Sequence, residues 1–309
     1  MIEIKNLFHK YRDREVLKGI TLSVNDAEIF GLLGPNGSGK TTLMRILCTA
    51  FPLISGEAKI AGLDLKTQAS EIRYLLGVVF QSPSLDNKLT VMENLMHQGR
   101  LYGLTGKKLR ERSSEMLSKL GVLDRAKDRV EKLSGGLKRR VEIAKSLLHQ
   151  PKLLILDEPS TGLDPGSRYD VWQYLKILKE EQGVTVLVTT HLMEEAELCG
   201  RVAIIDQGKV VALGRPEDLK RMVGGDVIQM QTRTASKLAA QLKERFQLTA
   251  VWEGDTVQVE HRMAAEFIPK IAETFPGEIL SMTFRKPTLG DVFMNKTGHS
   301  FWKEEEEKS

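Results

Sequence analysis

A glycine-rich motif at residues 34–41 constrains the fold of this chain more than any other feature. It reads GPNGSGKT and satisfies the pattern G-x-x-x-x-G-K-[ST], between an apolar strand candidate at 29–33 and a helix candidate at 41–48. Glycines let successive backbone N–H groups point into one concavity, and the following helix adds the positive end of its dipole. Lys40 is placed to reach β- and γ-phosphate oxygens, and Thr41 to hold Mg²⁺. The motif predicts a nucleotide-phosphate site, because pattern and context together disfavour a turn that binds nothing.

Short apolar strands alternate with helices from the first residues to about residue 221. Strand candidates lie at 29–33, 77–80, 153–156, 185–188 and 202–205, and helix candidates lie at 41–48, 91–104, 107–120, 136–148, 169–181 and 193–199. Strands this continuously apolar suit a parallel sheet that is covered on both faces. The alternation predicts an α/β fold. Only helices are expected between about 82 and 132, which indicates an inserted helical subdomain.

A second, smaller domain is predicted after the Gly224-Gly225 pair. Strand candidates at 227–232, 249–253, 256–260 and 278–284 and helix candidates at 236–246 and 264–275 follow the order β-α-β-β-α-β. This order is that of the ferredoxin-like split motif. We therefore expect a first domain at 1–221, a small α+β domain at 225–300, and a solvated acidic tail at 301–309.

Composition narrows the class of protein further. A chain of 309 residues exceeds what one hydrophobic core usually supports, and no apolar run approaches the ~18 residues of a membrane-spanning helix. The charged first residues leave no room for a signal-peptide core, and two cysteines are too few for a disulfide framework. We therefore expect a cytoplasmic protein. A net charge of +4 is too weak to predict a nucleic-acid-binding face, so no nucleic acid partner is expected.

Polar residues follow two of the predicted buried strands. Asp157 and Glu158 end the strand at 153–156, and His191 follows the strand at 185–188. Ligands of open α/β sheets sit at such strand ends. Neighbouring residues of an extended chain point opposite ways, so Asp157 suits the Mg²⁺ shell and Glu158 suits the attacking water. His191 could hydrogen-bond a γ-phosphate or the water. Taken alone, each of these residues could also be structural, and the phosphate motif favours the functional interpretation.

The nucleotide is expected to be an adenosine nucleotide. A guanine reader of the form N-K-x-D is missing, because the run that begins at Asn87 and Lys88 ends in Thr90.

The segment Leu133-Ser134-Gly135-Gly136 completes a set of motifs that resembles the ATP-binding-cassette (ABC) ATPases. The set also contains the phosphate motif, Gln81, Asp157-Glu158, the run from Ser160 to Asp164 and His191, and the resemblance covers residues 2 to 221. It implies a P-loop NTPase fold and ATP hydrolysis. One departure stands out, because Leu137 occupies the position where the family usually has glutamine.

The resemblance also implies how the remaining residues act. Residues 134–136 would close over ATP held by a second cassette, giving a head-to-tail dimer, expected to be a homodimer, with two ATP molecules. Ser134 would touch the partner's γ-phosphate, Asp164 would link the two sites, Gln81 would sense Mg²⁺ and the water, and Tyr11 would stack on adenine. The helical subdomain would contact a separate membrane permease, so the chain would lie on the inner face of the cell membrane.

The C-terminal segment 287–298, PTLGDVFMNKTG, and the run 137–144 resemble cassette subunits of ABC-2-type exporters such as drug-resistance ATPases. This predicts an ATPase subunit of an exporter of a drug, lipid or glycan. Two alternatives stay open. A soluble ABC ATPase that remodels nucleic acid or ribosomes is disfavoured by the single cassette and the weak basic charge. A phosphate-loop kinase leaves the segment at 133–136 unexplained.

The predicted site thus divides into three groups. The catalytic candidates are Glu158, His191 and Gln81. The ATP-binding candidates are Tyr11, Gly34, Pro35, Asn36, Gly37, Ser38, Gly39, Lys40, Thr41, Thr42, Ser134, Gly135, Gly136 and Asp164. The Mg²⁺ candidates are Thr41, Gln81 and Asp157.

Overall fold

The computed structural model describes residues 1–299 and 301 and divides the chain into two compact units, 1–210 and 211–309. The division falls inside one strand and lies earlier in the chain than the boundary expected from the sequence. The cause is the segment around 216–221, a helix that packs on the last helix of the second unit. Apart from Phe301, the predicted acidic tail lies outside the described residues.

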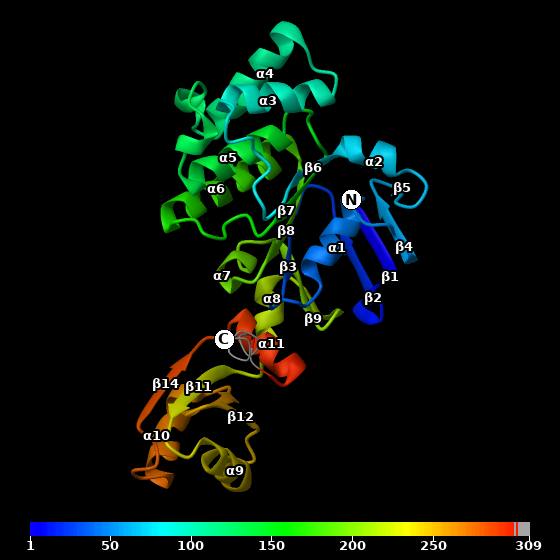
Figure 1. Ribbon diagram of the computed structural model, residues 1–309. Helices are drawn as coiled ribbons and strands as arrows, with labels where there is room; N and C mark the ends of the chain where they lie inside the picture. The colour runs from blue at the N-terminus through cyan, green and yellow to red at the C-terminus, as the bar shows by residue number, and fades with distance from the viewer. Residues whose placement is uncertain (300, 302–309) are drawn as a thin grey trace. The chain divides into compact units, whose positions relative to one another are not determined.

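A six-stranded sheet forms the centre of the first unit (Figure 1). Its strands are β3 (Ile29–Leu33), β6 (Leu76–Val79), β7 (Leu153–Asp157), β8 (Thr185–Thr190), β9 (Arg201–Asp206) and β10 (Lys209–Gly214). They lie in the order β10-β9-β3-β8-β7-β6, and the pairs from β9 to β6 are parallel. The strands β3, β7 and β8 are buried at every residue, as the continuous apolar runs predict for a sheet covered on both faces.

A second sheet of the first unit is antiparallel and was not predicted from the sequence. It contains β1 (Ile2–Tyr11), β2 (Arg14–Val24), β4 (Ser55–Ile60) and β5 (Leu63–Asp64) in the order β2-β1-β4-β5. The helix α1 (Lys40–Leu47) shares one hydrophobic core with both sheets, for example through Leu43 and Met44. This packing fixes the start of α1, and hence the loop before it, at the end of β3.

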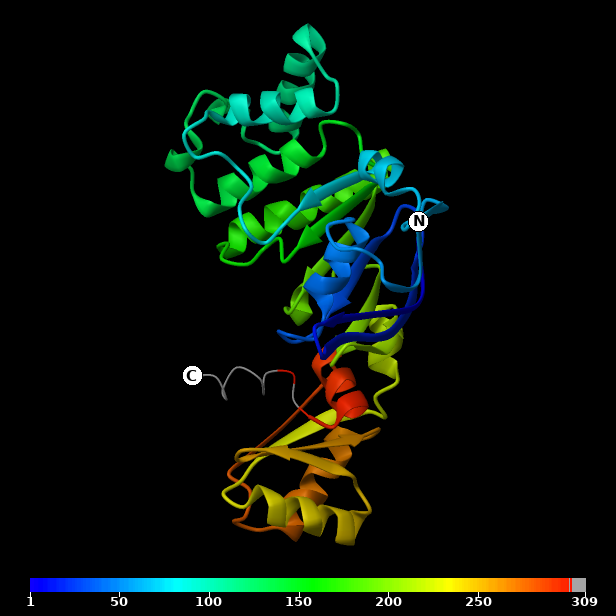
Figure 2. The ribbon, with the colours of Figure 1, turned by 45° about the vertical axis from the view of Figure 1, so that its right-hand side comes forward.

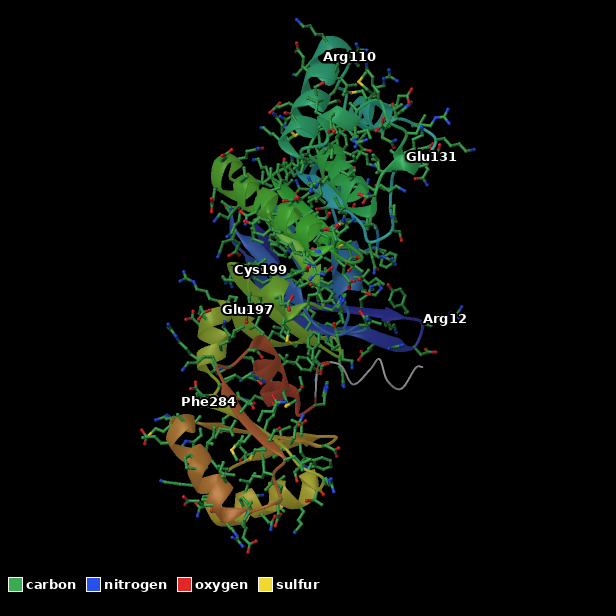
Figure 3. All side chains as sticks on the ribbon, turned by 90° about the vertical axis from the view of Figure 1, so that its left-hand side faces the viewer. Arg12, Arg110, Glu131, Glu197, Cys199 and Phe284 are labelled. Atoms are coloured by element: carbon green, nitrogen blue, oxygen red, sulfur yellow. The ribbon has the colours of Figure 1, made fainter. Side chains whose placement is uncertain are left out.

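The other helices of the first unit are α2 (Ala69–Leu75), α3 (Val91–Leu101), α4 (Gly106–Lys119), α5 (Gly135–Ser146), α6 (Pro165–Gln182) and α7 (Met193–Ala196). The stretch from 82 to 132 contains α3, α4 and two short 3₁₀ turns, at Leu123–Arg125 and Val130–Lys132. The helix α5 packs on α3 and α4 (Figure 2). Exposed Arg110 of α4 lies at the end of this helical region that is farthest from the sheets (Figure 3).

The second unit has the predicted order β-α-β-β-α-β. Its strands β11 (Asp226–Gln231), β12 (Ala250–Glu253), β13 (Thr256–His261) and β14 (Ser281–Arg285) form an antiparallel sheet in the order β12-β13-β11-β14. The helices α9 (Ala235–Phe246) and α10 (Ala264–Thr274) share a core with this sheet. Two further helices, α8 (Pro216–Arg221) and α11 (Leu289–Thr297), pack on each other. In the described part, 1–299 and 301, no helix has the length and apolar character to cross a membrane.

Asp291 explains the motif at 287–298 in structural terms. Its buried carboxylate accepts hydrogen bonds from the Thr288 amide (2.7 Å) and hydroxyl (2.8 Å), which cap α11, and a bidentate pair from Arg285. Burial alone raises the pKa of Asp291, but the hydrogen bonds from Arg285 and Thr288 and the charge of Arg285 outweigh it. The net pKa therefore lies below its usual value.

We expect Asp291→Asn to destabilise the second unit by about 1–2 kcal/mol at pH 7, since charge-assisted hydrogen bonds are lost and Arg285 is partly exposed. The folded pKa is depressed, so this stability is fully present above the unfolded pKa of about 3.9 and is lost as pH falls through the folded pKa. Amide hydrogen exchange of β11 and α11 at pH 7 and at low pH measures both effects, with exposed Glu244→Gln as the control. Equal protection in the wild type and Asp291→Asn would contradict this role.

Candidate nucleotide-binding and hydrolysis site

The phosphate loop, residues 34–41, connects β3 to α1 and depends on its glycines. Gly37 (φ 81°) and Gly39 (φ 109°) adopt left-handed backbone angles that side chains disfavour. A Cβ atom on Gly34 would lie 2.3 Å from the Ile205 carbonyl oxygen. Only glycine at these positions lets the backbone curl at the start of α1, where unpaired amide groups and the helix dipole favour an anion.

Lys40 lies inside this loop. Its side chain is buried, and Nζ donates to the carbonyl oxygens of Gly34 (2.7 Å) and Pro35 (2.9 Å). Both acceptors are neutral, so a phosphate oxygen would be a stronger partner for the ammonium group. Ser38 Oγ is buried and has no hydrogen-bond partner among the described residues. An orphaned hydroxyl beside a buried cation fits a loop that receives a phosphate group.

The donor set next to the loop fits Mg²⁺. Thr41 Oγ1 donates to Asp157 Oδ1 (3.3 Å), and Thr189 Oγ1 donates to the same oxygen (2.5 Å). Magnesium prefers one or two carboxylates together with hydroxyl, water and phosphate oxygens over an all-protein cage. The described residues contain no group of three or more His, Cys, Asp or Glu side chains that could hold a metal. Thr41 and Asp157 are the residues that could hold this ion, whereas Gln81, the third Mg²⁺ candidate, contacts Glu158.

Burial controls the ionisation of Asp157. Burial raises the pKa of its carboxyl, the hydrogen bond from Thr189 opposes the rise, and the charge of Glu158 adds to it, so the net pKa is above its usual value. A cation beside the carboxylate would favour the ionised form.

Glu158 and its neighbours form a second cluster at the same edge of the sheet. Gln81 Nε2 (3.3 Å) and Thr161 Oγ1 (3.1 Å) donate to Glu158 Oε2, and His191 Nδ1 lies 3.2 Å from Oε1. The structure therefore brings the three catalytic candidates together. They follow the ends of β6, β7 and β8, and they meet because these parallel strands end at the same edge of the sheet.

The backbone at Glu158 is in an unusual conformation. Its φ of 44° lies in the left-handed region, and its amide donates to the Thr189 carbonyl (3.1 Å) and hydroxyl (3.0 Å). Such a conformation costs of order 1–3 kcal/mol for a residue with a side chain and is concentrated at functional sites. The turn separates the Glu158 carboxylate, which contacts Gln81 and His191, from the Asp157 carboxylate, which contacts Thr41.

The signature turn, residues 134–136, begins α5 elsewhere in the first unit. Ser134 is exposed, and its Oγ accepts a hydrogen bond from the Leu137 amide (3.3 Å). A Cβ on Gly136 would lie 2.3 Å from Ser167 Oγ, and Asp164 accepts from the Ser167 amide (2.9 Å). The signature turn and Asp164 are therefore neighbours.

The structure does not bring the signature turn to the phosphate loop of the same chain. The helix α1 lies between the two sheets, whereas α5 packs on α3, α4 and α6, and the two helices lie apart in both ribbon views (Figures 1 and 2). The start of α5 is thus a second, exposed helix N-terminus with its own capacity for an anion.

Tyr11 lies beside the start of α1. Its hydroxyl is 3.4 Å from Thr42 Oγ1, its ring packs edge-on to Phe51, and the side chain is 43% exposed. An exposed aromatic face next to the phosphate loop is available for a nucleobase.

The sequence did not predict the roles of Thr189 and Arg139. Thr189 contacts both acidic residues, and Arg139 donates to the carbonyl oxygens of Asp157 (2.8 Å) and Pro159 (3.0 Å). A signal existed for each. Two threonines end an otherwise apolar strand, and Arg139 follows Gly136 by three residues and so lies on the buried face of its helix.

This fold and site define a phosphate-loop nucleoside triphosphatase. The family model for the ABC transporter domain matches residues 17–161. The linearmycin resistance ATP-binding protein LnrL of Bacillus subtilis (strain 168) is 36% identical over 97% of this chain and 99% of its own length. The daunorubicin resistance ATP-binding protein DrrA2 of Streptomyces coeruleorubidus is 38% identical over 94% of this chain and 92% of its own.

Among solved structures, the dimeric structure of MJ0796, a bacterial ABC transporter cassette, is similar with a TM-score of 0.65 and 29% identity. The matched region covers 70% of this chain and 98% of the MJ0796 chain. The chain therefore belongs to the ABC transporter ATP-binding proteins. It binds and hydrolyses ATP as the cassette subunit of a transporter.

Proposed function

We propose that this chain is the ATPase subunit of an ABC-2-type exporter, in which two copies close head to tail over two ATP molecules. One observation carries the proposal. The hydrolytic residues gather at one edge of the six-stranded sheet, whereas the signature turn is exposed elsewhere and is free to meet a second chain. Each complete site would then contain the phosphate loop of one protomer and the signature turn of its partner. Asp164, next to Ser167 and Gly136, would link the two sites.

The proposed reaction is in-line attack of water on the γ-phosphorus of ATP. Glu158 orients the water and accepts its proton, the new bond forms to phosphorus, and the bond to the β-phosphate oxygen breaks to give ADP and phosphate. Lys40 exchanges its two carbonyl partners for β- and γ-phosphate oxygens. When bound at Thr41 and Asp157, Mg²⁺ would neutralise charge on the same oxygens. Gln81 and His191 hold the Glu158 carboxylate through the contacts described above.

The transport partner is proposed to be a separate membrane permease on the inner face of the cell membrane. The helical subdomain at 82–132 of the cassette at 1–221 would contact the permease. It would pass on to the permease the motion that it receives through α5. Relatives named for linearmycin resistance, daunorubicin resistance and Nod factor export indicate a drug, lipid or glycan as the cargo. The domain at 225–300 is proposed to steady the dimer or regulate it.

Cells that contain the chain, lack it, or carry Glu158→Gln test the export proposal. We expect loss or substitution to raise the intracellular accumulation of at least one compound from a panel of polyenes, anthracyclines and lipo-oligosaccharides. Equal accumulation of every compound, together with ATP hydrolysis that RNA or DNA stimulates, would instead favour the nucleic-acid-remodelling alternative.

A further inference from the structure

We propose that Arg139 is a positioning residue that couples the signature helix α5 to the loops carrying Glu158 and Gln81. The residue lies on α5 one turn after the signature turn, and its side chain is only 7% exposed. The proposal rests on the hydrolytic role proposed above for Glu158.

Arg139 contacts the backbone on both sides of Glu158. Its Nη2 donates to the Asp157 carbonyl oxygen (2.8 Å), and its Nε donates to the Pro159 carbonyl oxygen (3.0 Å). These two carbonyl groups bracket the residue that adopts the left-handed φ of 44°. One guanidinium group therefore holds the strained turn from both ends.

The same side chain also holds the strand that ends at Gln81. Arg139 Nη1 donates to the carbonyl oxygen of Phe80 (2.7 Å), the residue directly before Gln81. Since Gln81 donates to Glu158, the guanidinium fixes both members of that hydrogen bond relative to α5. A planar group with five N–H donors can serve three carbonyl oxygens from two loops, which a lysine ammonium cannot reproduce in the same geometry.

Glu142, one turn later on α5, completes the link. Its buried carboxylate accepts from Arg139 Nη1 (3.0 Å) through Oε2 and from the Ser84 amide (2.6 Å) through Oε1. Lys145, a further turn along, donates to the Ser84 carbonyl oxygen (2.6 Å). The loop at 81–84 is therefore attached to α5 at both of its ends.

This arrangement transmits a displacement of the signature turn to the hydrolytic cluster of the same chain. When a partner's nucleotide binds at Ser134, the helix that carries Arg139 moves, or is held in place, as one rigid element. The carbonyl groups around Glu158 and before Gln81 follow the helix because Arg139 is hydrogen-bonded to them. The two composite sites of the dimer are coupled through this contact set, which acts on the geometry of Glu158 and leaves the phosphate loop untouched.

The neighbouring arginine provides a matched control. Arg140 has the same charge on the same helix, but it pairs with Asp170 of α6. We expect Arg139→Gln to lower kcat for ATP about 10–100-fold with KM within about threefold of the wild type, as for a residue that acts through the catalytic group. Arg139→Lys keeps the charge but loses the planar guanidinium group with its five donors, so we expect a kcat between those of the wild type and Arg139→Gln. Arg140→Gln should keep the wild-type kcat and KM.

The folding and the kcat of these variants decide the proposal. If Arg139→Gln does not fold, Arg139→Lys carries the test, with a lower kcat at unchanged KM as the supporting result. A wild-type kcat in both folded Arg139 variants overturns the proposal, and so does an equal loss in Arg140→Gln. If Glu158→Gln itself hydrolyses ATP at the wild-type rate, the proposed role of Glu158 fails first. If Glu158→Gln is inactive and the Arg139 variants are normal, the coupling role alone fails.

Discussion

Glu158→Gln is expected to lower kcat for ATP by about 10²–10⁴-fold and to leave ATP binding intact. The reason is chemical, since the amide keeps the size of the carboxylate and can still accept a hydrogen bond from Thr161 but cannot take a proton from water. The substitution also removes a negative charge from the edge of the sheet where we propose that the γ-phosphate binds. Binding should therefore be as tight as in the wild type or tighter. Phosphate release gives the rate, and titration calorimetry with ATP and Mg²⁺ gives the affinity.

The control for this prediction is Glu180→Gln on α6, which removes the same charge at a side chain that is 62% exposed. It should hydrolyse ATP at the wild-type rate. If Glu158→Gln retained more than about a tenth of the wild-type kcat, general-base catalysis by this residue would be ruled out, since such catalysis contributes about 10²–10⁴-fold.

Lys40→Ala is expected to weaken ATP binding by about 10²–10⁴-fold and to abolish turnover. Its ammonium would make charge-assisted hydrogen bonds to two phosphate oxygens, each contributing about 1.5–3 kcal/mol. The free protein should lose little stability. The two bonds that the side chain now makes go to carbonyl groups of its own loop, and removing a buried cation also removes its desolvation cost.

Calorimetric titration and the melting temperature without nucleotide measure these two effects separately. Lys59→Ala, at an exposed position of β4, is the control and should change neither quantity. Tight ATP binding by Lys40→Ala would show that the phosphate groups lie elsewhere. A collapse of the melting temperature without nucleotide would show that Lys40 has a mainly structural role.

The sequence predicted the parallel sheet and the gathering of Glu158 and His191 at one edge for the same physical reason. Strands covered on both faces must be apolar throughout, so β3, β7 and β8 stand out as runs, and polar residues at their ends share one edge. Glu158 and His191 can therefore be assigned to one place from the sequence alone. The contact of Glu158 with Gln81 also depends on the position of β6 beside β7.

The antiparallel sheet was missed although its signal was present. In β1 the buried residues Ile2 and Ile4 alternate with exposed Glu3 and Lys5, as expected for a strand with one covered face. The alternation then breaks, because the pairing of β1 with β2 shifts register between Ile4 and Leu7 and again further on. A bulged strand does not keep the period of two, so this part of the fold could not be read from periodicity alone.

The packing around α5 could not be predicted from sequence for a different reason. The position of Arg139 three residues after Gly136 predicts that it is buried. Its contacts, however, depend on where the loops after β6 and β7 meet the helix, and no local pattern encodes that meeting. At Leu137, by contrast, the contact that the structure shows is made by the backbone. Ser134 Oγ caps α5 by accepting a hydrogen bond from the Leu137 backbone amide, so this contact is independent of the side chain that replaces the usual glutamine.

The most direct test of the account mixes two inactive variants. Lys40→Ala removes the phosphate-loop cation, and Ser134→Arg blocks the signature turn, so neither homodimer has an intact composite site. In an equimolar mixture, random pairing gives heterodimers with one site that carries both defects and one that carries none, about a quarter of all composite sites being intact. We expect ATP hydrolysis to reappear on mixing. A mixture as inactive as its two components, or full activity of Ser134→Arg alone, would contradict it.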